Sequence, residues 1–182
     1  MSHLEARPVL AAMIAALFLS ACGGKSQESS RIYPLGDKVQ VGHLIYTAHE
    51  TQWLTQIQQD PTPRIPQDRF FLIRITAVNS GGGVAAVPNM VIENDQGKTY
   101  EELSNGDGVP QWVGYLREVR PADTIQGYVV FDAPAAHYKL RVMDETNEKA
   151  ELIDIPLSFN SETPGVQLPT TDEPNIKKDI RH

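Results

Sequence analysis

Short runs in which hydrophobic and polar residues alternate recur along the middle of the chain. The strongest run is 69–79 (RFFLIRITAVN), in which Phe71 and Ile73 fall on one face and Arg74 and Thr76 on the other. A period of two residues is typical of a β-strand with one buried face. Similar runs, rich in β-branched and aromatic residues, occupy 38–41, 43–51, 90–92, 124–132, 138–142 and 150–157.

Residues that favour turns separate these runs. Residues 94–97 (NDQG) suit a hairpin turn, because Gly97 can take a positive φ, and Tyr100 then lies on the return arm. A further turn is predicted at 144–148 (DETNE), between the last two strands.

The final run places Ile153, Ile155 and Leu157 on one predicted face. No stretch of the chain repeats its apolar residues with the 3.6-residue period of a helix. The whole pattern predicts an all-β fold: an antiparallel β-sandwich of about seven strands over residues 35–158, long enough to bury a core without disulfides.

An apolar run of a different kind lies near the N-terminus, at 9–19 (VLAAMIAALFL). It has the length of the hydrophobic part of a signal peptide and is too short to span a bilayer. With Leu19-Ser20-Ala21-Cys22 at its end, it resembles a bacterial lipoprotein signal sequence with its lipobox. The resemblance implies a signal peptide at 1–21, cleavage before Cys22, and lipidation of Cys22.

Two alternatives remain for this segment: an ordinary cleaved signal peptide with an incidental Cys22, or an uncleaved anchor. In the lipoprotein interpretation, residues 22–34 form a flexible tether and the domain is held at the extracytoplasmic side of the cell envelope. The resemblance to Gram-negative lipoproteins implies that Gly23 stands where an aspartate would retain the protein in the inner membrane. An outer-membrane location is therefore expected if the organism is Gram-negative.

Charge and composition narrow the function classes. The net charge is −7, and no cluster of Lys and Arg provides the basic surface that nucleic-acid binding requires. The single cysteine excludes an intrachain disulfide.

Residues 159–182 are rich in Pro, Thr, Asp and Glu and are predicted to be a disordered tail.

Four segments together resemble the DUF4352 family of extracellular immunoglobulin-like domains. They are 36–42 (GDKVQVG), 70–79 (FFLIRITAVN), 95–100 (DQGKTY) and 121–131 (PADTIQGYVVF). The resemblance extends over roughly 36–156 and implies an immunoglobulin-like sandwich related to a mycobacterial secreted protein. It implies no catalysis, because family members are typically lipid-anchored or secreted modules of unknown role.

The residues themselves offer little catalytic or metal-binding chemistry. No G-x-S-x-G elbow, H-x-x-x-H or C-x-x-C occurs, and His43, His49 and His137 are widely spaced. The acidic stretch 101–108 (EELSNGDG) carries oxygen ligands but lacks the spacing of a calcium-binding EF-hand loop. We therefore predict no catalytic residue, no metal site and no cofactor.

The irregular connection 103–118 is the candidate interaction loop, because it carries Trp112 and Tyr115. Exposed aromatic side chains on loops are common recognition anchors. In the alternative, Trp112 folds back as a lid over the sandwich and only the Tyr115 hydroxyl meets water. For Trp53, at the end of a predicted strand, core packing is the expected role.

Two function classes remain. The domain is either a binding module for an unidentified protein, glycan or small ligand, or an accessory subunit that pairs through a sandwich edge with a larger envelope complex.

Overall fold

A computed structural model describes residues 31–158 of the chain. The predicted signal peptide, Cys22 and the C-terminal tail at 159–182 lie outside the described residues. Within 31–158 the chain forms eleven β-strands and no helix, so no helix there is long and apolar enough to cross a membrane. The strands are β1 (Ile32–Tyr33), β2 (Val39–Val41), β3 (Leu44–Leu54), β4 (Phe70–Asn79), β5 (Ala85–Ala86), β6 (Val91–Asn94), β7 (Thr99–Glu101), β8 (Glu118–Val119), β9 (Thr124–Asp132), β10 (Tyr138–Met143) and β11 (Ala150–Ile155).

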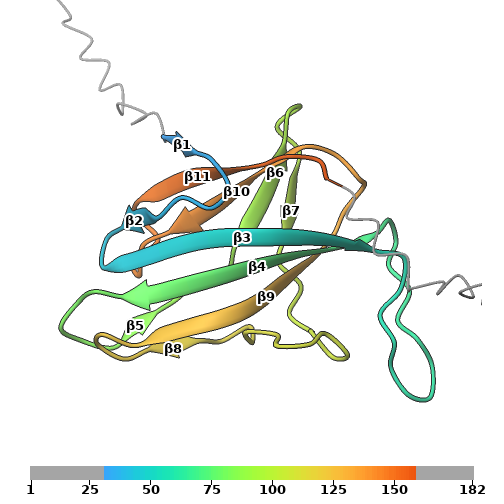
Figure 1. Cartoon of the computed structure of the whole chain (residues 1–182), viewed down its shortest axis with the longest axis horizontal. Helices are drawn as coiled ribbons and strands as arrows, with labels where there is room; N and C mark the ends of the chain where they lie inside the picture. Colours follow the sequence, from blue (N-terminus) through green and yellow to red (C-terminus); the bar gives the residue numbers. More distant parts are fainter. Residues whose placement is uncertain (1–30, 159–182) are drawn as a thin grey trace, which may run out of the picture.

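The strands form two facing sheets and a short ribbon (Figure 1). One sheet has the order β1-β11-β10-β6-β7, the other β2-β3-β4-β9, and β5 pairs with β8. This arrangement confirms the predicted β-sandwich. All named strand pairs are antiparallel except β1 with β11, which is parallel. β1 also shows that the sheet begins at Ile32, inside the stretch assigned to the tether.

The core between the sheets follows from the alternation in the sequence. On β4, Phe71, Ile73, Ile75 and Ala77 face inward and are almost fully buried. They meet the inward residues of the other sheet, which include Ile92, Tyr138, Leu140, Val142, Ile153 and Ile155. The prediction that Leu157 shares this face is wrong: β11 ends at Ile155, Pro156 follows, and Leu157 is 46% exposed.

A β-bulge in β3 changes which residues of that strand face the core. Before the bulge Tyr46 and Ala48 face inward, and the register with β4 shifts between Ala48 and Glu50. The extra residue turns Thr51 and Trp53 inward instead of their neighbours. Trp53 stacks on Phe71 with the ring centroids 4.0 Å apart, which confirms its packing role.

A second, smaller hydrophobic cluster covers part of the outer face of the four-stranded sheet. Phe70, Leu72 and Val130 alternate with the core residues and therefore point to this outer face. Two irregular segments, 55–69 and 103–118, bring Ile57 and Val109 over them. Arg64 joins the two segments, because its guanidinium donates to the carbonyl oxygens of Asn105 and Asp107 at 3.1 and 2.9 Å.

Asn79, the last residue of β4, organises the chain at one end of the sandwich. Its side chain is fully buried. Its amide donates to the carbonyl oxygens of Gly83 at 2.7 Å and Val119 at 2.8 Å, and its Oδ1 accepts from the N–H of Gly81 at 2.8 Å. One side chain thus fixes the path from β4 to β5 and the position of β8.

We predict that Asn79→Ala destabilises the domain by about 1–3 kcal/mol, because it leaves buried backbone groups without partners. The shift of the urea unfolding midpoint measures this loss. Asn89→Ala is the control, since the Asn89 side chain makes no hydrogen bond within residues 31–158. Equal midpoints for the two variants would contradict the role given to Asn79.

Candidate functional site

The path of the 103–118 segment is set by its attachment to the edge of β9. Leu103 donates its N–H to Val130 at 2.8 Å, and Val113 donates to Tyr128 at 3.2 Å. Tyr128 in turn donates to the carbonyl oxygen of Gln111 at 2.9 Å. Gly127 permits this approach, because a Cβ at that position would overlap the Gln111 carbonyl oxygen. The segment therefore covers much of the β9 edge.

The structure separates the two aromatic residues predicted to form the interaction loop. Trp112 is half-buried and packs against the second hydrophobic cluster, over Gly106. Trp112 thus folds back onto the domain, as in the lid alternative, but over the outer face of the four-stranded sheet and not over an end of the sandwich. Its indole N–H is buried without a hydrogen-bond partner among the described residues. Tyr115 is also half-buried, but it lies on the other side of the attachment point, in a groove.

This groove, of about 610 Å³, lies between the β5–β8 ribbon and the end of β10. Its lining combines apolar and polar side chains, which include Ala86, Pro88, Tyr115, Leu116, Met143 and Asn147. Leu116 is 93% exposed, the most exposed of the large hydrophobic residues in 31–158. A single exposed leucine is ordinary on a protein surface, but Leu116 shares this concave surface with Ala86, Pro88, Tyr115 and Met143, and this combination makes the groove the candidate functional site.

A buried ion pair lies at the base of the groove. Arg117 Nη1 is 2.6 Å from Glu102 Oε1, and Nη2 is 2.8 Å from Oε2, so the pair is bidentate. The Arg117 side chain is 3% exposed and the Glu102 side chain is fully buried. This geometry gives the strongest kind of charge-assisted hydrogen bond and fixes both planar groups.

The pair also satisfies three backbone groups, which belong to two neighbouring segments. Arg117 donates to the carbonyl oxygens of Gly114 at 2.8 Å and Pro88 at 3.0 Å, while Glu102 accepts from the Met90 N–H at 2.9 Å. The groove base is therefore rigid, and Leu116 projects from a fixed backbone. Sequence analysis missed this pair, because Arg117 lies fifteen residues from Glu102 and no periodic pattern connects them.

One residue pair of the β5–β8 ribbon points its backbone groups away from the partner strand, toward the two opposite edges of the ribbon. Val87 donates to the carbonyl oxygen of Arg117 at 3.0 Å, which identifies that pair as hydrogen-bonded. In an antiparallel ribbon the next pair, Ala86 and Glu118, then points its N–H and C=O groups outward. Both residues line the groove and are exposed.

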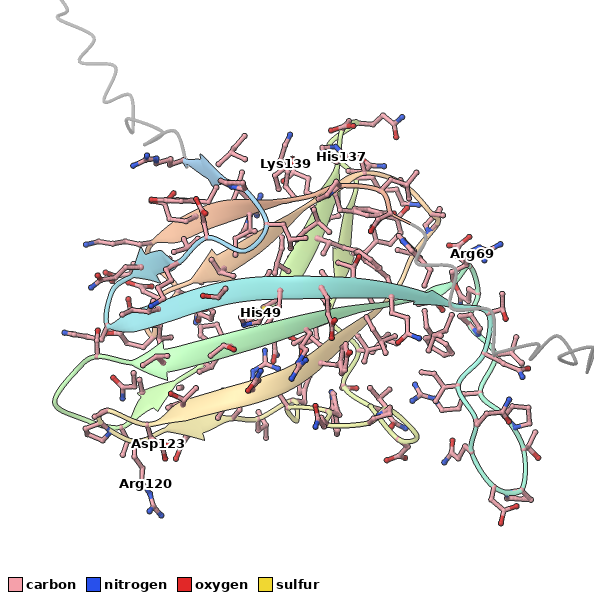
Figure 2. All side chains as sticks on the ribbon, in the orientation of Figure 1. His49, Arg69, Arg120, Asp123, His137 and Lys139 are labelled. Carbon is pink, nitrogen blue, oxygen red and sulfur yellow. The ribbon has the colours of Figure 1, made fainter. Side chains whose placement is uncertain are left out.

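The three widely spaced histidines lie at separate places in the described structure. His43 pairs with Glu145 across two turns, and His49 lies on the outer face of the four-stranded sheet (Figure 2), 2.8 Å from the Thr76 hydroxyl. His137 lies between Asp95 and Asp154. Within residues 31–158, no group of three or more His, Cys, Asp or Glu side chains is arranged to hold a metal ion.

Residues 33–150 match the sequence profile described as "Domain of unknown function (DUF4352)". The chain belongs to this family. The match includes the four-stranded sheet, strands β6, β7 and β10 of the other sheet, and the groove, and it confirms the resemblance seen in the sequence motifs. A sequence comparison with curated proteins gives no match.

Solved structures share the fold at low sequence identity. The yjhA protein of Bacillus subtilis is 13% identical with a TM-score of 0.52, over 68% of this chain and 99% of that one. The secreted protein MPT63 of Mycobacterium tuberculosis is 14% identical with a TM-score of 0.52, over 70% and 97%. A candidate lipoprotein, ycdA of B. subtilis, is 9% identical with a TM-score of 0.52, over 66% and 38%.

We predict that Arg117→Met destabilises the domain by about 3–5 kcal/mol, because it leaves the Glu102 carboxylate charged and buried. The double variant Arg117→Met/Glu102→Leu should lose less than the single variant. Guanidinium unfolding midpoints measure both. Arg141→Met is the control, since its 2.7 Å ion pair with Glu93 is partly exposed and contributes less than about 1 kcal/mol. A double variant less stable than Arg117→Met would contradict the prediction.

Proposed function

We propose that this protein is a lipid-anchored, extracytoplasmic binding module without catalytic activity, which holds a segment of a partner polypeptide in the groove beside Leu116. The carrying observation is a 93% exposed leucine at the rim of a groove whose base is fixed by a buried ion pair. Rigid, pre-organised surfaces lose little entropy on binding, and a few well-packed side chains, often Trp, Tyr or Arg, carry most of the affinity, which draws attention to Tyr115 beside Leu116.

The form of the groove supports a polypeptide partner. A small-molecule site usually encloses most of its ligand, whereas this groove is open along one side. Its mixture of apolar side chains with the exposed polar side chains of Glu118 and Asn147 suits a polypeptide segment that supplies both apolar contacts and hydrogen bonds.

The proposed extracytoplasmic location is supported by the N-terminal sequence and by proteins of similar fold. The lipobox at Leu19–Cys22 supports lipidation of Cys22, which lies outside the described residues. Among the proteins of similar fold, one is named as secreted and another as a candidate lipoprotein, and both descriptions agree with an extracytoplasmic domain.

The edge strands of the described structure make binding of a partner in the groove a better proposal than pairing of a partner with a sheet edge. The edge strands β1, β2 and β7 are only two or three residues long. β9 is longer, but the 103–118 segment covers part of its free edge. Short or covered edges are the usual protection against strand addition.

We predict that Leu116→Asp weakens partner binding roughly 10- to 100-fold, since a buried leucine contributes about 1.5–3 kcal/mol. A photo-crosslinker at Tyr115 in the full-length protein first identifies the partner polypeptide in intact cells. The affinity of the purified partner for each variant is then measured in detergent.

Ile65→Asp is the matched control, because Ile65 is a 67% exposed hydrophobic residue outside the groove. It should bind the partner as the unchanged protein does. The proposal fails if both variants bind equally well, or if no polypeptide is crosslinked from Tyr115.

The proposed lipid anchor at Cys22 can be tested independently of the groove. Cys22→Ala should abolish incorporation of labelled fatty acid, because the thiol accepts the diacylglyceryl group, and it should release the protein from the membrane fraction. Ser20→Ala, which keeps a small residue in the lipobox, should still be labelled. Fatty-acid labelling of Cys22→Ala would overturn the lipoprotein assignment.

A further inference from the structure

His137 is placed between two carboxylates that come from different parts of the five-stranded sheet. Its Nδ1 lies 3.0 Å from both Asp95 oxygens, in the turn between β6 and β7. Its Nε2 lies 2.8 Å from Asp154 Oδ1, on β11. Figure 2 shows His137 at this end of the sheet, beside Lys139 and far from the labelled residues of the β8–β9 turn.

The chemistry of imidazole determines which protonation state fits this site. An ionised carboxylate only accepts hydrogen bonds, so each ring nitrogen must donate one. A neutral imidazole carries a single N–H, and its second nitrogen would then point a lone pair at a carboxylate. Both contacts are favourable only for the doubly protonated imidazolium ring.

Two carboxylates and one cation surround the ring. On β10, Lys139 Nζ is 4.0 Å from Asp95 Oδ1; apart from the His137 ring, no other cation pairs with this carboxylate in the described chain, so the carboxylates outnumber the cation. The next charges on the same face, Glu93 on β6 and Arg141 on β10, pair with each other. The hydrogen bond that His137 donates to Asp95 is the main cause that raises the pKa of His137; partial burial opposes it and Asp154 adds to it.

We infer that His137 is a proton-dependent clasp, which ties the β6–β7 turn to β11 when its ring is charged and releases that turn when the ring loses its proton. Nothing in the proposed binding function requires this clasp, and the two are independent. Above the transition the neutral ring keeps a single N–H and donates to only one of the two carboxylates, so the link from the turn through the ring to β11 is broken.

The direction of the pH dependence follows from linkage. The pKa of His137 is raised above its ordinary value of 6.5 in the folded protein. Its contribution to stability is therefore complete below about pH 6.5 and disappears as the pH rises through the folded-state pKa. The clasp is closed in acid and open in mildly alkaline solution.

The test uses the full-length protein in detergent, with ¹³C-labelled histidine rings followed by NMR between pH 5 and 9. His137→Gln assigns the His137 signal. We expect His137 to titrate above pH 6.5, and Asp95→Asn and Asp154→Asn each to lower its midpoint by about half a pH unit or more. His49→Gln, which removes an exposed histidine bonded only to Thr76, should leave the His137 midpoint unchanged.

Hydrogen exchange of the β6–β7 turn provides a second readout. At pH 6 the turn amides should exchange several-fold faster in His137→Gln than in the unchanged protein, and at pH 9 the two should exchange alike. A midpoint at or below 6.5, a midpoint that shifts in only one Asn variant or in neither, or equal exchange at pH 6 would each overturn the clasp.

Discussion

The buried ion pair between Arg117 and Glu102 is the interaction on which the groove depends. Removing two charges from water is costly, and such a pair persists only where its geometry is good and its remaining donors and acceptors are satisfied. Here the contacts are bidentate, and backbone groups of Gly114, Pro88 and Met90 form hydrogen bonds with most of the remaining donors and acceptors of the two side chains. The pair thereby joins the end of β7, the start of β6 and the entry to β8. Its contribution is to fix one arrangement of these segments, more than to add net stability.

The close approach at Gly127 is the second constraint, and it acts on the same segment. The glycine lets residues 111–113 lie against β9, which places Trp112 on one side of the attachment and Tyr115 on the other. Trp112 then completes the outer hydrophobic cluster, while Tyr115 and Leu116 face the groove. The 103–118 segment therefore has two parts. The part with Trp112 packs against the domain, and the part with Tyr115 and Leu116 remains accessible in the groove.

The alternation of residues was sufficient to predict the long strands, because β4 and β9 carry their buried faces in local sequence. It could not predict β1, β5 and β8, since two residues contain no period. The inward turn of Trp53 depends on a bulge, and Leu157 was misplaced because Pro156 follows the end of β11. The sequence could not predict the groove for a different reason. Arg117 and Glu102 are fifteen residues apart, and only the three-dimensional structure shows that they are partners.

The position of the groove has a consequence for where a partner would lie. Asn147, on its rim, is in the turn that leads into β11, and the Arg31 N–H bonds to Glu151 at the start of that strand. The groove and the entry of the chain into the domain therefore share one end of the sandwich, whereas His137 and Asp154 lie toward the other. With Cys22 lipidated as proposed, nine residues span at most about 30 Å from the anchor to Arg31. A partner held in the groove would then be met within reach of the membrane, at the end of the sandwich opposite the histidine clasp.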